Sequence, residues 1–138
     1  MRRKYERIYP YAFALAAGVI FWRCRFPFPT GHDILSASIP MGAIFTGFLA
    51  TLESVVVTLQ NPKIDALRNT KFFGLLLSYL QEAIWMSLFY CAWGLGGYFY
   101  DEHNPPPWYG PIWVGLSCAT LLTFHRVSSI LISLIRSI

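Results

Sequence analysis

Four ionisable residues lie inside long apolar stretches of the sequence, and they are the residues most able to carry chemistry. They are Glu53, Glu82, His125 and Arg126. Two carboxylates, an imidazole and a guanidinium can form ion pairs, move protons or line a path for ions. We call these four residues the polar cluster and ask which elements position them.

The composition places these residues in a membrane. The 138 residues, sufficient for one domain over residues 1–138, are 55% hydrophobic and only 13% charged, whereas soluble chains carry about 25% charged residues. The mean hydropathy is +0.45. A soluble fold of this size cannot cover so much apolar surface. The net charge of +4 is therefore attributed to orientation in the bilayer, and we expect no direct contact with nucleic acid.

The apolar segments predict an all-α fold, a four-helix transmembrane bundle. The first segment is interpreted as a retained span, because no small-residue cleavage site follows it. The fourth helix can continue beyond its span to Ile138. The expected spans run over Ile8 to Trp22, Leu35 to Leu59, Phe72 to Tyr98 and Tyr109 to Leu131.

Basic residues indicate the direction of these spans. They concentrate in the N-terminal segment, in the loop between spans two and three, and at Arg136. The positive-inside rule then places both termini in the cytoplasm. Arg23 and Arg25, in the first outer loop, are exceptions that we expect at the level of the lipid headgroups.

The inner loop predicts a cytoplasmic extension of the third helix. Asn61 and Pro62 form a favourable N-cap and first-turn pair, so we expect the helix to begin near Pro62 and to run unbroken into the bilayer. This extension would present a partner surface formed by Lys63, Asp65, Arg68 and Lys71.

Helical geometry gives the depth of the polar cluster. At about 1.5 Å per residue, Glu53, Glu82 and Arg126 lie about 9, 15 and 8 Å from the inner surface. An isolated charge there costs at least about 2.5 kcal/mol, so we expect Arg126 to pair with Glu53 or Glu82, within one chain or between chains. An alternative is that desolvation keeps Glu82 protonated. The cluster is interpreted either as a structural staple or as a polar vestibule for ions.

A stripe of small residues marks span two. Its members recur at spacings of four, three and four, which lets another helix approach closely. We call it the small-residue stripe: Ala43, Gly47, Ala50 and Ser54.

Catalytic and metal sites are not expected. His125 and the nearby serines lack the oriented acid and the oxyanion site of a triad. His32-Asp33 and the 101–103 segment provide too few ligands for a convincing metal site, and no glycine-rich phosphate loop is present. We therefore expect no enzyme, no cofactor and no metal.

The stretch IPMGAIFTGFLATLESVVVTLQNPKIDALRNTKFFGLLLSYLQEAIWMSL, from Ile39 to Leu88, resembles the small four-helix membrane subunit of the bacterial Kiwa anti-phage system. In layout it is more distantly similar to the membrane protein of the lambda Rex exclusion system. The resemblance implies a homo-oligomer, a tetramer, in the bacterial inner membrane. Such an oligomer would sense an event at the membrane, or serve as an anchor there, and would engage a cytoplasmic effector.

Two other functions remain open at this stage. A Rex-like subunit would be an ion channel or pore-forming effector that depolarises the membrane. A small proton-coupled transporter is the third hypothesis, although the chain lacks the inverted repeat that would favour it. Membrane lipids are expected partners in all three cases.

Overall fold

The computed structural model describes residues 2–29, 31–60, 62–101 and 103–137, although not the side chains of residues 2, 3 and 137. Within these ranges the helix is the only regular secondary structure and there are no strands, which confirms the predicted all-α class. The helices are α1 (Arg2–Cys24), α2 (Asp33–Thr58), α3 (Pro62–Arg68), α4 (Lys71–Gly97) and α5 (Tyr109–Ser137).

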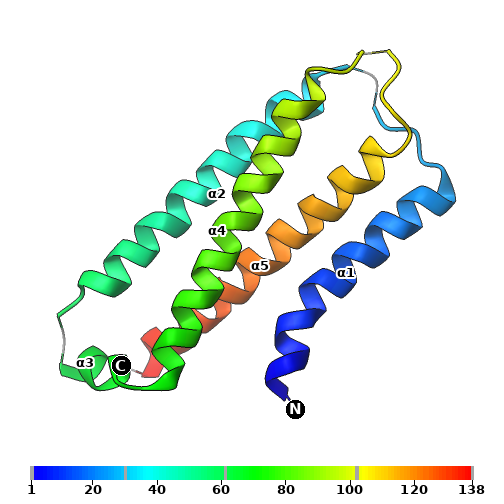
Figure 1. Cartoon of the computed structure of the whole chain (residues 1–138). Helices are drawn as coiled ribbons and strands as arrows, with labels where there is room; N and C mark the ends of the chain where they lie inside the picture. Colours follow the sequence, from blue (N-terminus) through cyan, green and yellow to red (C-terminus); the bar gives the residue numbers. More distant parts are fainter. Residues whose placement is uncertain (1, 30, 61, 102, 138) are drawn as a thin grey trace.

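The four long helices form a row in the order α2, α4, α5, α1 (Figure 1). α4 packs between α2 and α5, and α1 packs along α5 at the far edge. The α1–α2 and α4–α5 connections lie together at one end, which we call the loop end. Both termini and α3 lie at the opposite end, which we call the termini end (Figure 1).

Three helices are long and apolar enough to cross a membrane, namely α2, α4 and most of α5. α2 has 26 residues and therefore extends about 39 Å, more than the roughly 30 Å of a hydrocarbon core. α1 has 23 residues but does not meet the same criterion of apolarity. Its first turns carry Lys4, Glu6 and Arg7, which reduce its mean hydropathy.

The third helix is not continuous, so the predicted unbroken extension from Pro62 is wrong. α3 ends at Arg68, and Thr70 adopts an extended conformation with φ −97° and ψ 151° before α4 begins. Asn and Thr favour such positions because their short polar side chains compete with the helical hydrogen bonds. Arg68 then fixes the short helix, since its Nη2 donates to the carbonyl of Val57 at 2.6 Å.

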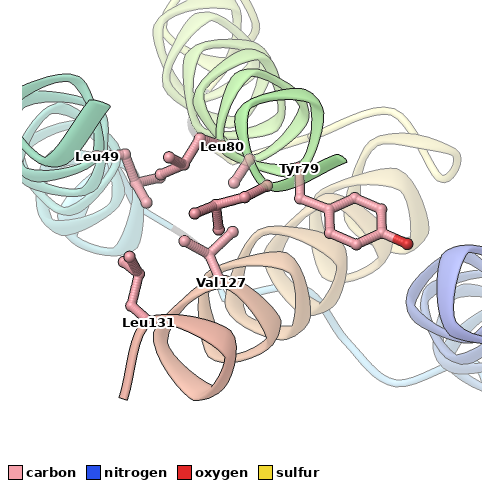
Figure 2. Packing of buried hydrophobic residues seen from close by; sticks show 7 residues of the cluster. Leu49, Tyr79, Leu80, Val127 and Leu131 are labelled. Atoms are coloured by element: carbon pink, nitrogen blue, oxygen red, sulfur yellow. The ribbon is translucent and has the colours of Figure 1, made fainter. Parts of the chain in front are cut away.

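The buried core joins α2, α4 and α5 in the half of the row nearer the termini end. Figure 2 shows side chains from these three helices meeting one another, with Tyr79 projecting toward the side of α1. In lipid such contacts stabilise by close packing, because there is no water to exclude. The cluster consists of Leu49, Leu76, Tyr79, Leu80, Ala83, Val127 and Leu131.

Aromatic side chains fix the loop end. The Tyr109 hydroxyl donates to the carbonyl of Trp93 at 2.6 Å, and the two rings are stacked with centroids 5.4 Å apart. Phe28, from the first connection, meets Tyr109 edge-on at 5.7 Å. Phe28 therefore holds the α1–α2 connection against the start of α5, and Tyr109 holds the start of α5 against α4.

Candidate functional site

An ion pair joins α4 to α5 at the level of the core. Nη2 of Arg126 lies 2.9 Å from Oε2 of Glu82, and the two side chains are only 5% and 17% exposed. The sequence predicted a pair with one of two acids, and the structure places Arg126 with Glu82. Pairing offsets much of the cost of removing both charges from water.

Three further groups complete this arrangement. The guanidinium of Arg126 lies over the ring of Tyr79, 4.1 Å from its centroid. Its Nη1 donates to the carbonyl of Glu6 at 3.2 Å, and the Tyr11 hydroxyl donates to Oε1 of Glu82. Glu6 and Tyr11 belong to α1, so the ion pair connects α1, α4 and α5. We call this set the staple: Glu6, Tyr11, Tyr79, Glu82 and Arg126.

The charged groups of the staple are paired with partners inside the chain. Both carboxylate oxygens of Glu82 have partners, and both terminal nitrogens of Arg126 donate hydrogen bonds or form the ion pair. Within the staple, Nε of Arg126 is the one buried side-chain polar atom that has no hydrogen-bond partner among the described residues. Groups held in this way fix the positions of the three helices relative to one another.

Glu53 and His125 lie outside the staple, so the structure splits the predicted cluster of four. Gln81 Nε2 donates to Oε1 of Glu53 at 3.4 Å, at the rim between α2 and α4. His125 is exposed although it is adjacent to Arg126, because consecutive residues on a helix point about 100° apart. Depth along the helices could not reveal this, since it ignores the face on which a residue lies.

The small-residue stripe does not pack against another helix of the same chain. All four of its residues are exposed, and a methyl group added at Gly47 would meet nothing within 4 Å. α2 instead packs on α4 through a neighbouring face, with Ser38, Gly42 and Leu49 buried. The buried residues of α2 recur at positions 35, 38, 42 and 49, a helical spacing that could have predicted this packing face and the place of Gly42 on it.

The predicted partner surface is assembled at the termini end. Lys63, Asp65, Arg68 and Lys71 are all exposed, and Ile64 is buried, which anchors α3 on the end of α4. Arg68 also lies 3.6 Å from Asp65, so these two charges partly neutralise each other. Lys63 and Lys71 are the other two basic residues of this surface.

Metal-ligating side chains do not converge. In the described ranges, no three residues among His, Cys, Asp and Glu lie close enough together to hold a metal ion.

The fold and the staple together define a helical protein with three helices long and apolar enough to cross a membrane, and with a buried ion pair that joins α4 to α5. Comparisons with protein families, with curated proteins and with solved structures found no match for the chain.

Proposed function

We propose that the protein is a homo-oligomeric membrane protein of the bacterial inner membrane that recruits a cytoplasmic effector of an anti-phage defence system. In this proposal α1 spans the bilayer together with α2, α4 and α5, and both termini are cytoplasmic. The observation that carries the proposal is the exposed small-residue stripe of α2, beside Glu53, which none of the described helices of the chain covers.

This side of α2 is unsuited to lipid. Glu53 lies five residues before the end of α2, about 8 Å inside the helix, and its hydrogen-bonding partner Gln81 is exposed. A carboxylate that faces hydrocarbon costs at least about 2.5 kcal/mol. The adjoining small-residue stripe offers a surface on which a second helix can pack closely. A second copy of the chain would bury both features together, which supports an oligomer with α2 at the subunit contact.

The charge distribution supports the cytoplasmic orientation of the termini end. Lys4, Arg7, Lys63, Lys71 and Arg136 are exposed there. Positive charge of this kind is retained on the cytoplasmic side during insertion and is attracted to anionic lipids.

The effector-binding surface is proposed on α3, which carries Lys63 and is anchored by Ile64, and on the adjoining first residue of α4, Lys71. The double substitution Lys63→Glu and Lys71→Glu should reverse the local charge. It should weaken the binding of an acidic effector about tenfold, equivalent to about 1.4 kcal/mol of binding free energy. We expect phage protection, measured as plating efficiency in the native genetic setting, to fall by a similar factor.

Lys4→Glu with Arg136→Glu is the matched control, because it changes the charge of the same end by the same amount away from α3. Membrane levels of all variants are measured in parallel. Unchanged protection after charge reversal at Lys63 and Lys71, or no protection by the wild type, would contradict the proposed recruitment.

A channel is the second candidate, favoured by one observation. Glu53 and the exposed His125 both lie outside the staple, so an assembly could bring such groups to a shared path. Planar-bilayer recording separates the two functions. A channel predicts unitary conductance that falls with Glu53→Gln, whereas an anchor predicts no conductance in either form.

A further inference from the structure

Two hollows adjoin each other where α1 meets α5. A cavity of about 490 Å³ lies at the loop end, between the end of α1 and the proline-rich segment 105–107. A groove of about 520 Å³ runs between α1 and α5, with Met86 of α4 also lining it. Trp22 and Pro111 line both hollows, so one extended molecule can occupy them together.

The chemistry of the two hollows differs. The groove is lined by apolar side chains apart from Tyr11, and each volume lies within the roughly 300–1,000 Å³ typical of ligand sites. Arg25 lines the cavity together with phenylalanines and prolines. The side chain of Arg25 has no hydrogen bond or ion pair with any residue that the structure describes. An apolar groove that opens beside a cation with no described partner is suited to bind an amphipathic anion.

We propose that these hollows form a binding site for an anionic glycerophospholipid. One acyl chain lies in the groove between α1 and α5, and the phosphate accepts hydrogen bonds from Arg25 at the loop end. Guanidinium groups recognise phosphate oxygens with paired, charge-assisted hydrogen bonds. The site also explains why a basic residue is placed on the side of the membrane that the positive-inside rule leaves poor in positive charge.

The position of the site distinguishes lipid from a second copy of the chain as the occupant. α1 is at the far edge of the row from α2, so the groove is remote from the uncovered polar side of α2. A packing helix would leave the Arg25 guanidinium unpaired, whereas a phospholipid satisfies the cation and the groove at once. The proposal requires the chain to lie in a membrane, and it is independent of the subunit contact and of the effector.

Native mass spectrometry of the protein purified with palmitoyl-oleoyl phosphatidylglycerol tests the headgroup. We expect the wild type to retain this lipid, and Arg25→Gln to reduce retention by about tenfold. Arg23→Gln is the control, because Arg23 is exposed and does not line the cavity. Excess inorganic phosphate should displace little lipid. Equal retention by the two variants, or equal retention of phosphatidylcholine by the wild type, would overturn the anionic site.

The acyl chain is tested by filling the groove. Val19 lines the groove and is 51% exposed, so Val19→Trp can occupy it without entering the core. Ile20 is 59% exposed but does not line the groove, so Ile20→Trp adds the same bulk elsewhere. We expect only Val19→Trp to lower lipid retention. Equal retention by the two tryptophan variants, or no lipid bound to the wild type, would contradict the proposal.

Discussion

Replacing Arg126 with leucine will lower the free energy of unfolding by about 3–5 kcal/mol, the usual cost of removing one partner from a buried pair. The substitution leaves the Glu82 carboxylate without its cation and the Glu6 carbonyl without its donor. It also removes the guanidinium from the ring of Tyr79. Reversible unfolding in mixed detergent micelles, followed by circular dichroism, measures the loss.

The double variant Glu82→Leu, Arg126→Leu is the informative companion. Without a carboxylate to leave uncompensated, it should recover much of the loss, giving a coupling energy of about 2 kcal/mol in the double-mutant cycle. Additive losses in the cycle would show that the pair contributes nothing as a pair, and the account of the staple would then be wrong.

Gly42→Leu will also destabilise the fold, by about 3 kcal/mol, because α2 and α4 approach closely at this position. A Cβ atom at Gly42 would lie 3.0 Å from Cβ of Cys91 and 3.2 Å from the carbonyl oxygen of Ser87. The larger leucine side chain forces the two helices apart and disturbs the adjacent core. Unfolding of the detergent-solubilised monomer measures the effect.

Gly47→Leu is the matched control on the same helix. A Cβ atom there meets nothing within 4 Å, so we expect the free energy of unfolding of the monomer to change by no more than about 0.5 kcal/mol. Equal losses for the two glycines would show that the described packing face of α2 is not the one used.

The long helices could be predicted from sequence because apolar runs of this length have few alternatives in a membrane. Their predicted limits at Leu35, Phe72 and Tyr109 lie within two residues of the observed starts. The break at Asn69 and Thr70 was missed, because charged residues on both sides continue a plausible helical pattern. The available signal was that the hydroxyl of Thr70 can compete for backbone hydrogen bonds, and in the structure it donates to the carbonyl of Leu67 at the end of α3 rather than capping α4.

The ion pair could be predicted from free energy alone, because an unpaired Arg126 in an apolar span would be costly and an acidic partner offsets that cost. Its remaining partners were not. Tyr79 precedes Glu82 by three residues, so spacing on one helix could have suggested it. Tyr11 and Glu6 lie on a separate helix, and their place beside Arg126 depends on how α1 packs along α5. The outward direction of His125 likewise depends on helix rotation, which neither depth nor composition determines.

We propose that a second copy of the chain covers the small-residue stripe of α2, and the mass of the particle in lipid nanodiscs tests this contact. We expect two or more copies for the wild type, and a tetramer if the chain follows the Kiwa-like resemblance. Ser54→Leu, on the small-residue stripe, should shift the protein toward the monomer. Val55→Leu, at the adjacent position and exposed, should leave the assembly unchanged. A monomeric wild type, or equal behaviour of the two variants, would contradict the claim.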